Sequence, residues 1–215
     1  MVVPRPRDET TAARRLLPYG ERAVLVECSD LDEALGLMAA LQRQPMEAVE
    51  EIVPGARSLL LRLRRPLTHR EEREISGRER AEPVGEAASQ VEIEVDYDGD
   101  DLEEVAELTG LSPQEVVSTH TGQFWTVGFC GFAPGFAYLR GEHDRLRVPR
   151  RSTPRTRVPA GSVGLADQWS GVYPRRGPGG WQLIGHTDRA VWDLRREPPA
   201  LLRPGAVVRF VDRHA

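Results

Sequence analysis

The chain has 215 residues and a formal net charge of −4, and all 29 of its basic residues are arginine. The absence of lysine excludes a Schiff-base lysine, a biotinyl- or lipoyl-lysine and the phosphate-binding lysine of a P-loop. Because Cys28 and Cys130 are the only cysteines, we expect neither a disulfide framework nor a structural zinc site. No apolar run reaches the roughly 18 residues of a membrane span, and no signal peptide is evident, so we expect a cytoplasmic protein without membrane contact.

The first part of the chain predicts a small α/β domain over residues 16–85, after a flexible tail over residues 1–15. Strands are expected at 22–27, 50–53 and 58–63, and helices at 31–44 and 68–80. Ser29 or Asp30 is suited to cap the first helix, and Thr68 to cap the second. The order β-α-β-β-α is typical of a whole or half ferredoxin-like fold. Residues 80–90 resemble a linker.

The second part, residues 88–215, predicts a β-rich domain. It opens with an alternating strand at 91–97, a helix at 102–108 capped by Asp100 or Asp101, and a further helix that begins after Ser112. Short apolar runs then alternate with glycine and proline turns, and we expect strands at 124–129, 162–166, 181–184, 190–193 and 207–211. This pattern favours a barrel or a sandwich.

Charge is divided unevenly along this second part. Residues 89–123 contain ten acids and no arginine, whereas residues 145–161 contain six arginines between prolines 149, 154 and 159. Guanidinium groups held by prolines suit a carboxylate or a phosphate, and we take Arg150, Arg155 and Arg157 as candidate anion-binding residues. The alternatives are a solvated loop, or ion pairs with the acids of 89–123 within the chain or across a subunit contact. The acidic neighbourhood and the lack of a nucleic-acid motif argue against nucleic acid.

Two glycine-rich segments are candidates for a ligand pocket. Residues 128–138 (GFCGFAPGFAY) set aromatic side chains beside flexible backbone, and Pro134 and Gly135 lie at the centre of this segment. The alternative is a β-turn with core aromatics on either side. Residues 174–181 (PRRGPGGW) offer the backbone N–H groups of Gly179 and Gly180, followed by Trp181. We also expect Gln168 and Tyr173 to position a small polar substrate.

His120 and His186 are the candidate groups for proton transfer, since His120 ends the helix after Ser112 and His186 follows an expected strand. A lone histidine is more often a satisfied structural group. The chain has no HExxH motif and no other metal-ligand spacing, so we expect no metal site.

The chain resembles, from about residue 16 to 211, the family that includes the B subunit of 5-oxoprolinase (PxpB), the kinase inhibitor KipI and allophanate hydrolase subunit 1. In the N-terminal half the matching stretches are 18–27 (PYGERAVLVE) and 54–61 (PGARSLLL). In the C-terminal half they are His120, 131–139 (GFAPGFAYL), 149–163 (PRRSTPRTRVPAGSV), Gln168, 171–174 (GVYP), 178–181 (PGGW), 184–185 (IG), 197–201 (EPPAL) and 204–205 (PG). One departure is His186, which stands where the family usually has arginine. A titratable cation there would weaken anion binding at higher pH.

This resemblance implies an α+β protein in which a cyclophilin-like β-barrel follows the N-terminal domain. It also implies a homologous second subunit (PxpC- or KipA-like) and a third, metal-dependent subunit (PxpA-like). Together they resemble a 5-oxoprolinase, which uses ATP and water to convert 5-oxoproline into glutamate, so we expect ATP shared with the partners and no activity of this chain alone. The alternatives are an inhibitor of a sensor histidine kinase, as in KipI, and an amidohydrolase subunit of the allophanate hydrolase type.

Overall fold

The computed structural model describes residues 13–81 and 90–215. These residues divide into two compact units, one built mainly from residues 13–81 and one mainly from residues 90–215. Most of the expected tail over 1–15 and of the expected linker over 80–90 lies outside the described residues. Among the described residues, no helix has the length and apolar character that crossing a bilayer requires.

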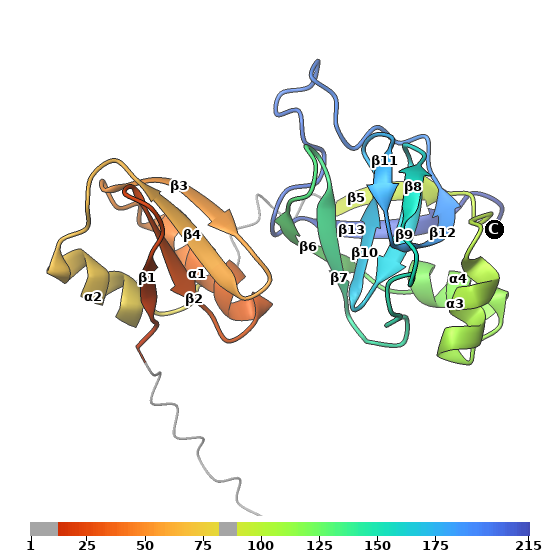
Figure 1. Cartoon of the computed structure of the whole chain (residues 1–215), viewed down its shortest axis with the longest axis horizontal. Helices are drawn as coiled ribbons and strands as arrows, with labels where there is room; N and C mark the ends of the chain where they lie inside the picture. The colour runs from red at the N-terminus through yellow and green to blue at the C-terminus, as the bar shows by residue number, and fades with distance from the viewer. Residues whose placement is uncertain (1–12, 82–89) are drawn as a thin grey trace, which may run out of the picture. The chain divides into compact units, whose positions relative to one another are not determined.

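The first unit contains a four-stranded sheet with strand order β1-β2-β4-β3 and two helices (Figure 1). Strand β2 pairs antiparallel with both β1 and β4. The elements in chain order are β1 (Leu16–Pro18), β2 (Ala23–Glu27), α1 (Leu31–Arg43), β3 (Val49–Pro54), β4 (Ser58–Leu63) and α2 (His69–Gly77).

Local capping signals fix where the two helices of this unit begin. The Asp30 side chain accepts the backbone N–H of Glu33 at 2.8 Å, which satisfies one of the free donors at the start of α1. Thr68 and Glu71 form a reciprocal capping box at the start of α2. Both predicted caps are therefore confirmed, and α1 buries its apolar residues on the sheet side of this small core.

The ferredoxin-like arrangement is not confirmed. The edge of the sheet beside β2 is occupied by β1, a three-residue strand that precedes β2 and was not expected. A ferredoxin-like β-α-β-β-α-β order places a strand after the second helix. In the described part of the chain, no strand after α2 joins this sheet.

The second unit is a nearly closed seven-stranded barrel with strand order β12-β9-β10-β7-β6-β13-β5 (Figure 1). Its barrel strands are β5 (Gln90–Val95), β6 (Trp125–Cys130), β7 (Ala137–Gly141), β9 (Ser162–Ala166), β10 (Trp169–Val172), β12 (Gln182–His186) and β13 (Val207–Asp212). The remaining elements are α3 (Leu102–Thr109), α4 (Pro113–Thr121) and the small ribbon of β8 (Arg155–Val158) and β11 (Gly177–Gly179).

The residue pair Asp96 and His186 joins the two edges of the barrel sheet. Asp96, just after β5, and His186, at the end of β12, exchange two backbone hydrogen bonds of 2.8 Å. The neighbouring pair β5 and β13 is parallel, and every other pair in the sheet is antiparallel. The expected barrel is thus confirmed, and we call the Asp96–His186 contact its seam.

The interior of the barrel follows from the alternation of apolar and acidic residues on β5. Ile93 and Val95 are fully buried, whereas Glu92 and Glu94 are exposed. Helix α3 packs against β12, and α4 packs against β13. The strand expected at 190–193 is wrong, because these residues lie in a long loop with one isolated bridge between Trp192 and Ala200.

Candidate ligand site in the barrel unit

Arginines of the 145–157 segment pair with a buried carboxylate at the start of α3. Arg155 holds both oxygens of Asp101, with Nη1–Oδ2 and Nη2–Oδ1 distances of 2.8 Å each. Arg151 donates to the same carboxylate and lies 3.4 Å from Glu104. The backbone N–H of Leu183 also donates to Asp101, at 2.7 Å. One carboxylate therefore joins α3, the arginine segment and β12.

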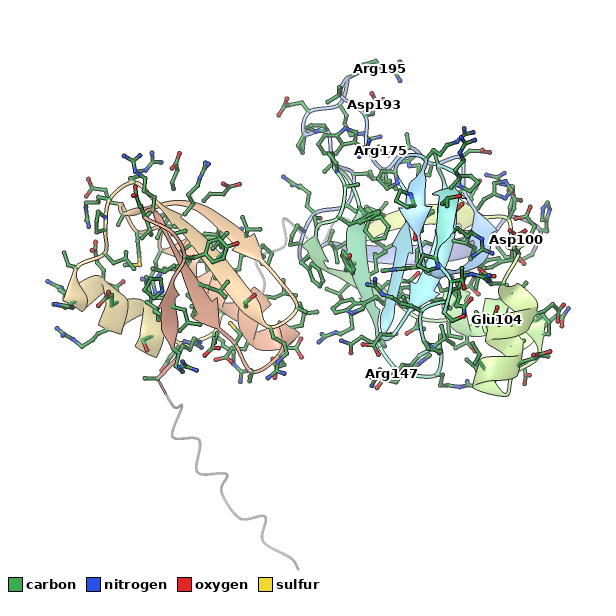
Figure 2. All side chains as sticks on the ribbon, viewed as in Figure 1. Asp100, Glu104, Arg147, Arg175, Asp193 and Arg195 are labelled. Atoms are coloured by element: carbon green, nitrogen blue, oxygen red, sulfur yellow. The ribbon has the colours of Figure 1, made fainter. Side chains whose placement is uncertain are left out.

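This environment keeps Asp101 charged although its side chain is only 3% exposed. Burial by itself raises the pKa of Asp101, but hydrogen bonds from Arg155 and Leu183 and the positive charges of Arg155 and Arg151 outweigh it, so the pKa is lowered. Asp100 and Glu104 lie at the same end of α3 (Figure 2). Asp100 is far more exposed than Asp101, and its nearest carboxylate oxygen is 3.6 Å from Nη2 of Arg155, which is longer than a hydrogen bond.

Of the alternatives for this segment, ion pairing within the chain is confirmed for Arg151 and Arg155. The guanidinium of Arg155 is already held by two hydrogen bonds, so it is not available as a free anion clamp. Arg157 lies on the same strand, β8, and is exposed. Neither residue lines the cavity described next.

A small hollow gathers five of the residues that the sequence singled out. Arg150, Tyr173, Gly179, Gly180 and Trp181 line it. Three aromatic side chains from the 128–138 segment complete its lining: Phe132, Phe136 and Tyr138.

The walls of the hollow are aromatic rings packed edge to face. The ring of Phe136 is 1% exposed, and its centroid lies 5.2 Å from those of Tyr138, Tyr173 and Trp181. The interplanar angles of these three pairs run from 67° to 89°. Such contacts are worth about 0.5–1.5 kcal/mol each beyond the area they bury, so these four rings hold one another in place.

Gly179 is required where it lies because the Tyr173 phenol covers it. A Cβ atom at Gly179 would lie 2.2 Å from the Tyr173 hydroxyl oxygen and under 3 Å from the ring. Tyr173 is itself only 2% exposed, so its ring has little room to move. Gly179 in the sequence Gly-Gly-Trp therefore allows the backbone to pack closely against the ring of Tyr173.

We expect Gly179→Ala to destabilise the barrel unit by about 1–3 kcal/mol, because the added methyl group must displace a buried ring. Gly177→Ala is the matched control on the same strand, since a Cβ there meets nothing within 4 Å. Urea unfolding followed by tryptophan fluorescence measures both variants. Equal unfolding free energies for the two variants would contradict the packing described here.

The turn between β6 and β7 presents the aromatic residues. Backbone hydrogen bonds from Ala133 to Gly131 and from Phe136 to Ala133 close this turn. Gly135 has φ = +82°, and a Cβ there would lie 2.6 Å from Trp192. Pro134 is exposed. Pro134 and Gly135 therefore shape the turn and do not line the hollow.

Gln168 lies outside the hollow. It is in the turn between β9 and β10, beside Asp167, whose φ is +52°. Tyr173 follows the other end of β10, so the strand separates the two residues that we expected to act together. The expected role of Gln168 in holding substrate there has no support in this arrangement.

His120 is a core residue of the barrel unit. It is 0% exposed, and its ring packs against Trp125 and Phe210 at centroid distances of 4.9 and 4.3 Å. Its two ring nitrogens lie 2.7 Å from the Tyr97 hydroxyl and 2.9 Å from the Ser170 hydroxyl. Burial lowers the pKa of His120 to about 3. The alternative of a satisfied structural histidine fits this geometry, because both ring nitrogens have partners and the ring does not reach the surface.

His186 lies at the seam, at the opposite end of β12 from Trp181. Its Nδ1 is 2.8 Å from Asp98, and its Nε2 is 3.4 Å from Asp96. Asp188, Arg213 and His214 complete this charged group. The hydrogen bond to Asp98 and the nearby carboxylates raise the pKa of His186. A cation among carboxylates stabilises the seam, and an anion is not favoured there.

This placement predicts a pH dependence of stability. Because the folded-state pKa of His186 lies above its unfolded value, its stabilising contribution is present below about pH 6.5 and is lost as the pH rises through the folded-state pKa. We expect the free energy of unfolding to decline less between pH 6 and 8 in His186→Arg than in the native chain. His143→Gln, at an exposed position, is the control and should keep the native slope. If the free energy of unfolding of His186→Arg depended on pH as steeply as that of the native chain, His186 would not be the group that causes this pH dependence.

Among residues 13–81 and 90–215, no group of three or more histidine, cysteine, aspartate or glutamate side chains could hold a metal ion. Two features of the site were not singled out in the sequence. Phe132, Phe136 and Tyr138 line the hollow, and their signal was the density of aromatic residues around Pro134. Asp101 was considered only as a helix cap, and its side chain makes no cap hydrogen bond.

Known proteins resemble this chain in sequence and in fold. Residues 14–202 match the family described as carboxyltransferase domain, subdomain C and D. The B subunit of 5-oxoprolinase from Escherichia coli O157:H7 is 44% identical over 172 residues, which cover 77% of this chain and 79% of that protein. The corresponding B subunit from Bacillus subtilis (strain 168) is 52% identical over 124 residues. That match covers 56% of this chain and 52% of the relative, so it spans about half of each.

A solved structure has the same fold. The crystal structure of TTHA0988 superposes with a TM-score of 0.75 at 39% sequence identity. The match covers 90% of this chain but only 41% of that chain. The fold described here therefore recurs as one part of a longer protein.

Proposed function

The chain belongs to the family of the carboxyltransferase domain, subdomain C and D, that includes the B subunit of 5-oxoprolinase, and from this we propose that it is one component of an ATP-dependent 5-oxoprolinase. The complete reaction converts 5-oxoproline, ATP and water into glutamate, ADP and phosphate. The observation that carries this proposal is the 44% identity to a protein of that name across 79% of its length.

The reaction requires more than one set of groups. A lactam is a stable amide, and transfer of the γ-phosphoryl group of ATP to its carbonyl oxygen, with release of ADP, makes the carbonyl carbon a good electrophile. Water attacks that carbon, the ring C–N bond breaks to leave an amine and an acyl phosphate, and hydrolysis of the acyl phosphate gives glutamate and phosphate. The phosphoryl transfer needs cations around the phosphoryl group and donors aimed at the developing negative charge. The chain has no lysine, and Arg151 and Arg155 are already paired with Asp101. We therefore propose that partner subunits contribute most of the ATP site.

The partners proposed are a homologous second subunit and a third, metal-dependent subunit. The length of TTHA0988 supports such a division of labour, because the match to this chain leaves more than half of that protein for other parts. This chain would then be inactive alone.

Reconstitution tests the proposal. The chain is combined with the candidate second and third subunits, and formation of glutamate and ADP is measured with and without 5-oxoproline. We expect turnover that requires all three proteins, ATP and 5-oxoproline. The control is the same mixture without this chain. An assembled complex without 5-oxoproline-dependent ATP hydrolysis would contradict the proposal, and the kinase-inhibitor alternative would then be tested by histidine-kinase autophosphorylation.

A further inference from the structure

We propose that the aromatic hollow of this chain is a binding site for a small carboxylate with a flat, uncharged remainder, and that Arg150 contacts the carboxylate. The identity of the ligand as the 5-oxoproline substrate rests on the proposed function. The location and the chemistry of the site rest on the residues of the hollow.

The first argument is the unpaired charge of Arg150. Its neighbour Arg151 turns to Asp101, and Arg155 does the same. Arg150 lines the hollow instead, and among the described residues it makes no hydrogen bond or ion pair. A guanidinium presents a fork of N–H donors that matches the two oxygens of a carboxylate. Within the described part of the chain, the hollow thus has one free cation at its edge.

The second argument is the chemistry of the walls. Apart from Arg150, the lining consists of five aromatic side chains and the backbone of Gly179 and Gly180. Rigid rings with a few well-placed polar groups are typical of sites for small flat molecules. The Tyr173 hydroxyl supplies one such polar group, because Tyr173 lines the hollow with its oxygen beside Gly179 and a phenol O–H can donate a hydrogen bond. A lactam carbonyl is a suitable acceptor for that proton.

The third argument is the ring of Phe132 at the rim. It is 62% exposed, although its centroid lies only 5.4 Å from that of the buried Phe136. Its backbone has φ = +67°, a conformation that side chains other than glycine rarely adopt and that is often found beside ligands. An exposed ring held in this way would lose its contact with water once a ligand lay under it.

The size of the hollow selects between ligands. Its volume is about 50 Å³, which admits a carboxylate and the edge of a small ring and is too small to enclose a nucleotide. With one arginine and no second cation among the described residues of its lining, the site is matched to a single negative charge and not to a triphosphate. The hollow is therefore assigned to the carboxylate substrate and not to ATP.

Two probes and two variants test this site. The full chain is titrated by calorimetry with 5-oxoproline and with 2-pyrrolidinone, which is the same lactam without the carboxylate. We expect 5-oxoproline to bind at least about 10-fold more tightly, because a hydrogen bond to a charged partner is worth a factor of this order. Arg150→Gln should abolish this preference. Arg145→Gln, an exposed arginine of the same segment outside the hollow, should keep it.

The reconstituted assembly provides the second readout. There Arg150→Gln should raise the KM for 5-oxoproline about 10-fold, since a contact made equally in substrate and transition state affects KM and not kcat. An active assembly with an unchanged KM in Arg150→Gln would overturn the site and leave the proposed function intact. Arg150-dependent binding of 5-oxoproline to the chain without any turnover would support the site and overturn the proposed function. Absence of both binding and turnover would overturn both.

Discussion

Replacing Asp101 with alanine is expected to destabilise the barrel unit by about 3–5 kcal/mol, the range found when one partner of a buried ion pair is removed. The substitution leaves Arg151 and Arg155 without their carboxylate and the Leu183 N–H without its acceptor. All four tryptophans of the chain lie in residues 125–192, so tryptophan fluorescence during urea unfolding reports on this unit alone. Asp101→Asn keeps the shape of the side chain and should give an intermediate loss.

Asp100→Ala is the matched control for this experiment. Asp100 is 81% exposed and 3.6 Å from Arg155, so we expect a loss below about 1 kcal/mol, as for other surface pairs. Because the folded-state pKa of Asp101 is lowered, its contribution is present above its unfolded value and is lost as the pH falls through the folded-state pKa. The native chain should therefore lose stability in acid faster than Asp101→Asn. If Asp100→Ala and Asp101→Ala lowered the free energy of unfolding equally, the ion pairs of Asp101 would not be the stabilising feature described here.

A second large effect is expected for His120→Ala, which should cost about 3–5 kcal/mol of the free energy of unfolding. The substitution opens a cavity beside Trp125 and Phe210 and leaves the buried hydroxyl of Ser170 and the half-buried hydroxyl of Tyr97 without their partner. His120→Phe keeps most of the volume and should cost less, about 1–3 kcal/mol, because only the hydrogen bonds are lost. His69→Ala, at a position 95% exposed, should be neutral.

The same variants separate a structural His120 from a catalytic one. Burial lowers the pKa of His120 to about 3. Between about pH 6.5 and pH 3, His120 is therefore protonated in the unfolded chain and neutral in the folded chain. As the pH is lowered through this range, the free energy of unfolding should decrease in the native chain and should decrease less in His120→Phe. In the reconstituted assembly, His120→Phe should retain a kcat within a few-fold of the native value at a temperature where it is folded. Loss of kcat by about 100-fold or more in folded His120→Phe would show that the histidine has a catalytic role.

Elements with local signals were predictable from the sequence. The caps at Asp30, Thr68 and Ser112 lie within three residues of the groups that they satisfy, and all three helices begin as expected. The alternation on β5 likewise predicted its buried face. Strand β10 gave no such signal, because it has only four residues and two of them are Ser170 and Gly171, which are not typical of a strand.

The sequence indicated which segments form the site, but it did not indicate which side chains of those segments line the hollow. Arg150 and Arg151 are adjacent arginines with the same local sequence signal, yet one lines the hollow and the other pairs with Asp101, 50 residues away in the chain. Only the folded topology separates them. The same reason explains His186, whose neighbours Asp96 and Asp98 come from the other edge of the sheet.

The pairing of β5 with β13 has a consequence for synthesis of the protein. Strand β5 is the first strand of the barrel, and its neighbour in the sheet is β13, which ends at Asp212. Until β13 has been synthesised, residues 90–95 have no strand to pair with and the barrel lacks one of its inner strands. The barrel unit therefore completes its sheet only after residue 212 has been synthesised, whereas the strands and helices of the first unit are all available by residue 77. The two units would then reach their native states one after the other as the chain is made.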